Sequence, residues 1–436
     1  MSEIKVNKLS SRTGNAVTLG TSGDTFTIPA GVTLTNSGTA TGFGSDSDIS
    51  WQAVVTSDTT MVSGRGYFVD SSGGAITMTL PASPSLGDTV AIVALDGDTN
   101  AVTIARNSSN IEGTTDNLSI VTNYGAVTLI YSDASNGWYR HNNEAPDSFV
   151  SATGGTESTS GDYKIHTFNS SSNFVVSSAS NRGANNIVSY VVVAGGGGGG
   201  SSRGGGGGAG GFREGRASGE SYTVSPLNAP AGITVSAQTY PITVGAGGNG
   251  EPGPTNLGAG SKGGSSIFAT ITSAGGGGGR DDDSPDTTPK SPGGSGGGGG
   301  GGAAPVNTGG TGNTPPVSPP QGSNGGNGTS NDSQGNQGGG GGGATAVGVS
   351  NDQPVAHGGA GATTHITGSP VAYAGGGGAG AVPGKGVGSG GTGGGGNGNA
   401  NGSSNTGGGG GGGPGPGTNG GSSGGSGVVI IRYKYQ

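Results

Sequence analysis

The charged and aromatic residues that could bind a ligand lie in two short polar segments. Arg280 is followed directly by Asp281, Asp282 and Asp283, which form the densest charge cluster of the chain. Carboxylate oxygens suit Ca²⁺, but this run lacks the D-x-[DN]-x-[DN]-G spacing of a calcium-binding loop. We therefore expect a solvated acidic loop without a metal, able to contact a polar partner such as a glycan.

The second segment carries His365 and Tyr373 in an excursion with less glycine than its surroundings. It is one of the few places where a recognition surface could include an aromatic ring, although packing at a domain edge is the more ordinary role of such a tyrosine. The four histidines are scattered without H-x-x-x-H spacing, which indicates structural or surface roles. The candidate binding residues are thus Arg280, Asp281, Asp282, Asp283, His365 and Tyr373.

No residue pattern is typical of an enzyme. G-x-G-x-x-G matches are plentiful, but 108 glycines in 436 residues produce them by composition, and no G-x-x-x-x-G-K-[ST] motif occurs. Paired carboxylates, triads and metal clusters are missing, so we expect no catalysis and no cofactor. A polysaccharide depolymerase would need acidic residues clustered near aromatic ones, which the sequence does not show.

The composition restricts the partners and the compartment. A net charge of -8 and a pI of about 4.9 argue against nucleic acid or an anionic membrane as partner. Without cysteine, disulfides and thiolate metal sites are excluded. The N-terminus has no apolar signal-peptide core, and no run reaches the roughly 20 apolar residues of a membrane helix. We expect synthesis in a cytoplasm without a signal peptide, and no membrane insertion.

The candidate residues must be positioned by a glycine-rich stretch at about residues 195–427. It can be a disordered linker, because glycine loses the most backbone freedom on ordering. It can also be a bundle of polyproline-II-type glycine helices with three residues per turn, each satisfying its neighbours' backbone groups. Ordering costs roughly 1–2 kcal/mol per residue, and a hydrogen bond returns about 0.5–1.5 kcal/mol. A single glycine helix would therefore be unstable, and only a bundle of helices would be stable.

Three features favour the bundle. The stretch is flanked by the strand-like runs Ile187–Ala194 and Val428–Tyr435, which we expect to pair at its base. Polar, Pro-containing segments separate the glycine runs like turns between passes. Side chains recur at a spacing of three, which predicts an outer edge of a threefold helix, at Ala209/Phe212, Asn324/Asn327, Ser389/Thr392 and Asn419/Ser422.

The remaining chain reads as all-β, with almost no α-helix. We expect an N-terminal fibrous attachment segment at 1–45, a small β-sandwich or prism at 46–145, a polar linker at 146–161 and a glycine-rich domain at 162–436. Within the second of these, Thr89–Leu95 is apolar on both faces and is expected at the centre of a sheet. In the last, Tyr163–Phe168 and Asn173–Ser177 are expected to form a hairpin.

Several motifs carry a resemblance to a known family. SYVVVAGGGGGG (189–200), GGAGGFREG (207–215), YPITVGAGG (240–248), GGSSIFATITSAGGGGG (263–279) and GSGVVIIRY (425–433) resemble the glycine-rich domain of bacteriophage tail fibres and adhesins. The stretch GYFVDSSGGAITMTLPASPSLGDTVAIVALDG (66–97) is similar to a repeated β module in tail fibres of marine and cyanobacterial phages.

The resemblance implies a structural virion protein, commonly a homotrimer, whose N-terminal part attaches to other tail or baseplate proteins. In such adhesins the loops joining packed polyglycine-II helices contact the receptor, here a host surface glycan or outer-membrane protein. The loops of this chain match no fixed receptor-binding motif, so no contact residue carries over. A capsid, neck or other extracellular structural fibre without a receptor-binding role stays open as the alternative.

Overall fold

The computed structural model describes residues 49–97, 100–141, 148–253, 259–281, 291–302, 307–329, 336–353, 355–415 and 420–436. The chain divides into two compact units, Met1–Asp48 and Ile49–Gln436. The attachment segment expected at 1–45 lies outside the described residues, which all belong to the second unit. Its regular structure is nearly all strand, with a single short 3-10 turn, η1 (Gly183–Asn186), in the described part.

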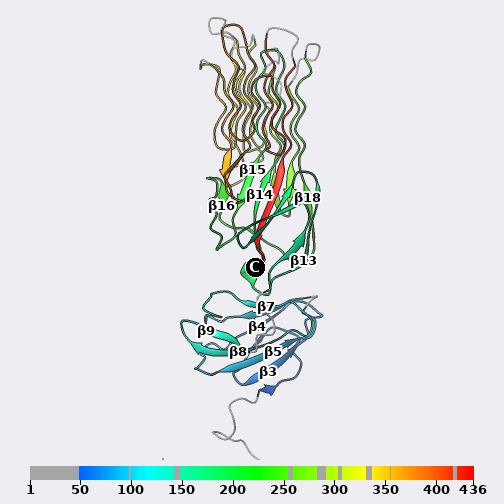
Figure 1. The fold of residues 1–436 in the computed structure, drawn as a ribbon, viewed down its shortest axis with the longest axis vertical. Coiled ribbons are helices and arrows are strands. Elements are labelled where there is room, and N and C mark those ends of the chain that lie inside the picture. The colour runs from blue at the N-terminus through cyan, green and yellow to red at the C-terminus, as the bar shows by residue number, and fades with distance from the viewer. Residues whose placement is uncertain are drawn as a thin grey trace, which may run out of the picture. The chain divides into compact units, whose positions relative to one another are not determined.

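The first part of this unit is a β-sandwich of two sheets (Figure 1). One sheet has the order β1-β3-β5-β8-β9 and the other the order β2-β4-β6-β7. The strands of the first are β1 (Ser50–Trp51), β3 (Arg65–Val69), β5 (Thr89–Ala94), β8 (Ala126–Asp133) and β9 (Gly137–His141). The strands of the second are β2 (Thr59–Thr60), β4 (Ile76–Thr79), β6 (Val102–Ala105) and β7 (Leu118–Ile120).

From β1 to β6 the chain passes alternately between the two sheets, so that neighbouring strands within each sheet run parallel. Alternating side chains then point into one shared core, with Met78 of β4 and Ile104 of β6 facing Ile92 of β5 and Trp138 of β9. The strand β5 is the middle one of its sheet, which confirms the central position expected for Thr89–Leu95.

The strand-rich base of the glycine-rich part contains two larger sheets. One has the order β10-β13-β18-β19-β20, and the other β11-β12-β23-β14-β15-β16, with β17 paired to β14. The first comprises β10 (Ser151–Thr153), β13 (Ser172–Ser178), β18 (Thr239–Thr243), β19 (Ser266–Phe268) and β20 (Ile271–Ser273). The second comprises β11 (Thr156–Ser160), β12 (Tyr163–Phe168), β14 (Ile187–Val193), β15 (Phe212–Gly215), β16 (Asn228–Ala229), β17 (Ile233–Thr234) and β23 (Val428–Lys434).

The strands that flank the glycine stretch pair as expected. β14 and β23 are antiparallel neighbours, with Ser189 opposite Arg432 and Val193 opposite Val428. Both are buried on both faces, which explains their unbroken apolar sequence. One face packs on Phe174 and Phe268 of the neighbouring sheet, and the other packs on a core that includes Phe212.

Two expectations for the base were wrong. β12 and β13 are not a hairpin, because β12 pairs with β11 and β23 whereas β13 pairs with β10 and β18. The segment 146–161 is not simply a linker either. It contributes β10 and β11, and its polar serines and threonines fit exposed edge strands.

From this base the glycine-rich passes run side by side, as Figure 1 shows for the thin yellow, orange and green segments beyond β14 and β15. Almost all of their backbone hydrogen bonds join different passes. A small sheet of β21 (Ala362–Thr364) and β22 (Val371–Tyr373) lies at the junction with the base core. The ordered bundle is therefore the correct alternative for the described residues of the stretch.

Candidate recognition surface at the tip of the glycine bundle

The segment Gly195–Gly200 shows how the bundle is built. Its successive N–H groups donate to three different antiparallel passes in turn: Gly195 to Gly264, Gly196 to Gly425 and Gly197 to Gly208. The cycle then repeats three residues on, with Gly198 to Ser261, Gly199 to Ser422 and Gly200 to Gly205. A repeat of three is the signature of a polyproline-II-type helix.

The carbonyl groups of the same segment serve three further passes, which run parallel to it. Gly195 accepts from Gly276 and Gly198 from Gly279, again a step of three residues. Gly196 and Gly199 accept from Gly248 and Glu251, and Gly197 and Gly200 accept from Gly410 and Gly413. Gly195–Gly200 is thus an interior helix with six neighbours, and each of its backbone donors and acceptors is satisfied.

Glycine is required here because the helices touch through their backbones. A Cβ atom added to Gly197 would lie 2.2 Å from the carbonyl oxygen of Gly277, and one on Gly207 would lie 2.1 Å from that of Gly197. No side chain fits at such separations, so the long glycine runs follow directly from the packing.

Side chains appear where a helix meets solvent or the base. Asn324 and Asn327 are exposed, as their spacing of three predicts, and their Oδ1 atoms accept from the backbone N–H groups of Gly312 and Gly309. The outer-edge prediction was wrong for Ala209 and Phe212, which are buried in the core beneath the bundle. The edge asparagines occupy backbone donors that would otherwise be left open.

The bundle has two ends that differ in chemistry. The base end meets an apolar core formed by residues such as Val193, Phe212 and Val428. The opposite end, called the tip end below, is tied by polar contacts, among them Gly205 N to Arg280 O and Gly301 N to Arg203 O. Gly415 N also donates to Ala381 O at this end. Several separate passes therefore turn within one small region.

Two buried polar side chains and a lysine lock the tip end. The Gln337 amide donates to the carbonyls of Gly380 and Gly386, at 2.8 and 2.9 Å, and accepts from Ala356 N. The Lys385 ammonium donates to Asn351 O at 2.8 Å and to Asn351 Oδ1 at 2.6 Å. Burial lowers the pKa of Lys385, with the charge of Asp352 acting in the opposite direction.

The candidate residues from the sequence are separated by the structure. Arg280 and Asp281 lie at the tip end, but both are buried, at 1% and 0% exposure, because neighbouring passes enclose them. The expected solvated loop is thus wrong for Asp281. Burial and the charge of Asp281 together raise the pKa of the nearby Glu251 carboxyl. Asp282 and Asp283 lie outside the described residues.

His365 and Tyr373 belong to the other end. His365 is half-buried in the turn between β21 and β22, and its N–H donates to Thr223 O at 2.9 Å. Tyr373 is 7% exposed within the base core, and burial raises the pKa of its hydroxyl to about 12. Within this chain Tyr373 is therefore a packing residue, as the more ordinary expectation held. Neither His365 nor Tyr373 shares a surface with Arg280.

The exposed residues at the tip end were not among the candidate binding residues expected from the sequence. Asp352 and Gln353 follow the buried Asn351, and Pro383 and Gly384 form the turn before Lys385. Their only sequence signal is a break in the glycine runs by a Pro-containing polar segment. Within the described residues no group of three or more His, Cys, Asp or Glu side chains could hold a metal ion.

Comparison with protein families agrees with this architecture. The model of a family described as a glycine-rich domain matches residues 169–434, which is more than half of the chain. The chain belongs to this glycine-rich domain family. The matched region begins just after β12 and runs to the last residue of β23, and so includes the β14–β23 pair and the bundle between them. No curated protein matches the sequence.

The bundle therefore starts after β14 and ends before β23, which are paired strands of one sheet. Because β14 and β23 are hydrogen-bonded neighbours, both ends of the bundle are fixed at the base. Among the helices that the structure describes, none is long or apolar enough to traverse a bilayer.

Proposed function

We propose that this protein is a bacteriophage tail fibre or adhesin that recognises a host surface receptor without catalysis, through the tip end of its glycine bundle. The observation that carries the proposal is the tip itself. Exposed residues from different passes, the polar Asp352 and Gln353 and the turn residue Pro383, are held on a scaffold whose interior helix Gly195–Gly200 has every backbone group hydrogen-bonded. Loops on a rigid scaffold can change in sequence while the scaffold is kept.

The physical advantage of this arrangement is low flexibility at the binding surface. A loop that is already ordered loses less entropy when a ligand binds. The contacts of Gln337 and Lys385 order the tip, while the interior glycine helices below contribute no side chains for a partner to bind. Recognition by a host glycan or outer-membrane protein would then depend on a few exposed residues at the connections.

The rest of the proposal follows from the resemblance to phage tail fibres. The protein is a virion component that forms a homotrimer, and its N-terminal segment attaches to other tail or baseplate proteins. Native mass spectrometry tests the trimer. A monomer at micromolar concentration would contradict the trimer and leave the receptor-binding role to be tested separately.

Adsorption of phage particles to host cells tests recognition. The triple variant Asp352→Ala/Gln353→Ala/Pro383→Ala should slow adsorption while particle assembly is unchanged. Ser369→Ala, at an exposed position beside β22, is the matched control and should adsorb normally. Normal adsorption by the triple variant would contradict tip recognition.

A structural fibre on the capsid or neck is the alternative function. It predicts that the triple variant adsorbs normally and that the particles carry the tip end away from the host. Imaging of virions with an antibody fragment against the tip end distinguishes the two. Incubation of the protein with capsule or lipopolysaccharide should release no sugars if the non-catalytic role is correct.

A further inference from the structure

A cleft lies between the β-sandwich and the strand-rich base. It has a volume of about 1020 Å³, which is large enough for an oligosaccharide of several residues. One lip is the loop that follows Glu112 and includes Gly113 and Thr114. The other lip is the 3-10 turn that follows Arg182 and includes Gly183 and Asn185.

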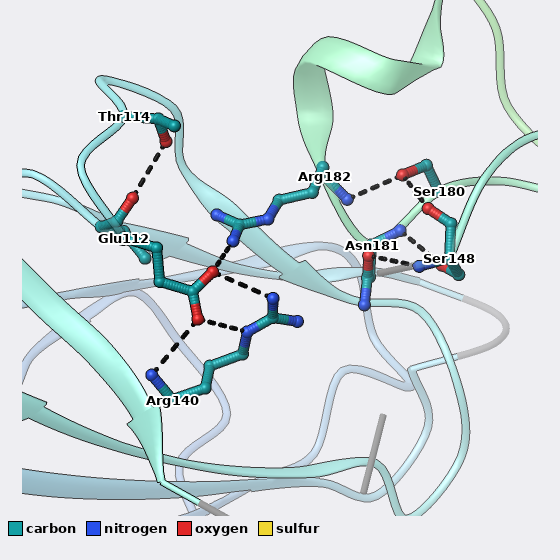
Figure 2. A network of polar contacts seen from close by, with 8 residues as sticks. Glu112, Thr114, Arg140, Ser148, Ser180, Asn181 and Arg182 are labelled. Atoms are coloured by element: carbon teal, nitrogen blue, oxygen red, sulfur yellow. Dashed lines mark hydrogen bonds and ion pairs between the residues drawn. The ribbon is translucent and has the colours of Figure 1, made fainter. Parts of the chain in front are cut away.

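Both lips are fixed next to the cleft by a charged clamp, which Figure 2 shows. The Glu112 carboxylate accepts from Arg140 Nε at 2.9 Å and forms an ion pair with Arg182. Ser119 N also donates to Asn181 O at 2.9 Å, which adds a backbone link across the same junction. The cleft is thus formed before any ligand arrives, which lowers the entropy cost of binding.

The lining is made mostly of neutral hydrogen-bonding groups. Hydroxyl and amide side chains come from both lips and from strands β6 and β7, namely Thr103, Thr114, Thr115, Asn117, Ser119 and Asn185. Large apolar side chains, the usual anchors of a peptide, are represented by Ile187, and the aromatic ring is that of Tyr163. This chemistry fits a ligand rich in hydroxyl groups better than a peptide.

The cleft also holds more positive than negative charge that is not already paired. Arg106 and Lys434 line it, and within the described residues neither forms an ion pair. Lys434 Nζ lies 5.6 Å from the ring centre of Phe149. Of the two lining acids, Glu220 is bound to Arg432 at 2.9 Å, which leaves Asp116. Two free cations on a chain of net charge -8 favour an anionic ligand.

We propose that this cleft binds an acidic oligosaccharide, with Arg106 and Lys434 contacting its carboxylates and the hydroxyl and amide groups contacting its ring substituents. This site is separate from the tip and does not rest on tip recognition. Asp116 opposes the ligand charge, so its removal should strengthen binding.

Calorimetric titration of the full chain with a defined oligouronate tests the proposal, and a neutral oligoglucose of equal length is the matched probe. The oligouronate should bind and weaken as salt is raised. Arg106→Ala and Lys434→Ala should each weaken binding roughly ten-fold, the loss expected of one charge-assisted hydrogen bond. Asp116→Asn should bind more tightly than the parent chain.

Equal binding of the neutral sugar would overturn the acidic specificity. Equal binding of a poly-glutamate peptide would overturn the saccharide class, and no binding of the oligouronate would overturn the site. Circular dichroism melting of each variant separates lost binding from lost folding, and Asp116→Asn keeps the test valid if a cation variant unfolds. The triple variant Asp352→Ala/Gln353→Ala/Pro383→Ala should bind the oligouronate normally, which distinguishes this site from the proposed receptor surface.

Discussion

The imidazole Nε2 of His166 lies 3.0 Å from the hydroxyl of Tyr433, although 267 residues separate them in the chain. The two rings are stacked, with centroids 5.5 Å apart. His166 Nδ1 lies 2.7 Å from the carbonyl oxygen of Gly154, which can only accept. The proton therefore sits on Nδ1, and Nε2 accepts from the tyrosine. This contact joins β12 to the final strand β23 through a neutral, fully buried histidine.

Protonation of His166 should destabilise the fold. Burial lowers the pKa of His166 in the folded chain below its ordinary value of about 6.5, so the unfolded chain takes up the proton first as pH falls. The contribution of neutral His166 to the unfolding free energy is complete above about pH 6.5. It is lost below that pH, with a slope of at most about 1.4 kcal/mol per pH unit. Chemical unfolding between pH 8 and pH 5 measures this slope.

His166→Phe should unfold with a weaker pH dependence across that window, and His141→Asn, at an exposed position of β9, is the control. Glu157, with an oxygen 4.0 Å from Nδ1, and Lys164 act on the histidine with opposite signs. Burial raises the pKa of Glu220, and this shift stabilises the folded chain as pH falls, opposite to the effect of His166. Because both proteins contain Glu220, the difference in pH slope between His166→Phe and the parent isolates His166. Equal pH slopes of unfolding free energy for His166→Phe and the parent chain would contradict the neutral, buried state of His166.

A single methyl group inside the bundle should be costly. The Cβ atom of Gly197→Ala would lie 2.2 Å from the carbonyl oxygen of Gly277, in a contact that only backbone movement can relieve. We expect a loss of unfolding free energy of about 1–3 kcal/mol. In Gly386→Ala the nearest atom would be Val355 Cγ2 at 3.7 Å, an ordinary contact.

The control variant Gly386→Ala should be neutral or stabilised by up to about 1 kcal/mol, because alanine restricts the unfolded chain. Thermal melting of the two variants side by side gives the comparison. Equal melting temperatures would show that the interior helices are not packed as closely as described.

The tip end should depend on Gln337. Gln337→Ala removes two donated hydrogen bonds and one accepted bond at a fully buried site, with an expected loss of about 1–3 kcal/mol in local opening free energy. Amide exchange at Ala356 should accelerate accordingly. Thr392→Ala, an exposed position on another pass, should leave that exchange rate unchanged. An unchanged rate in Gln337→Ala would contradict the locking role.

The clamp should couple the β-sandwich to the base. In Glu112→Gln, the charges of Arg140 and Arg182 lose their shared carboxylate, and removal of one partner of a mostly buried pair costs up to about 3–5 kcal/mol. Faster exchange of the Ser119 amide is the expected readout. Glu157→Gln breaks the exposed pair with Lys164 and should cost at most about 1 kcal/mol. Similar effects of the two substitutions would argue against the clamp.

The sequence predicted the bundle and its paired flanks because both depend on local composition. Runs without Cβ atoms pack in few ways, and the apolar strands β14 and β23 required partners. The parallel winding of the β-sandwich was not predicted, since alternation in Ile76–Thr79 shows a buried face without naming the neighbouring strand.

Sites were harder to predict than elements. Asp281 was selected as a candidate because of its local charge density, yet neighbouring passes bury it. Burial in a bundle depends on passes that are distant in the sequence. Tyr373 was similarly placed in the base core by contacts with other strands. Gln337 and Lys385 carry no motif, because their role depends on which carbonyls come within reach once all passes are assembled.

The central claim is that the glycine runs are hydrogen-bonded helices inside an ordered bundle. Native-state hydrogen exchange of the Gly195–Gly200 amides, followed by NMR with ¹⁵N-glycine labelling, tests it most directly. All six N–H groups donate to neighbouring passes, so strong protection is predicted, comparable to that of Val191 in β14. Exchange at the rate of an unstructured glycine peptide would contradict the bundle and the tip surface built on it.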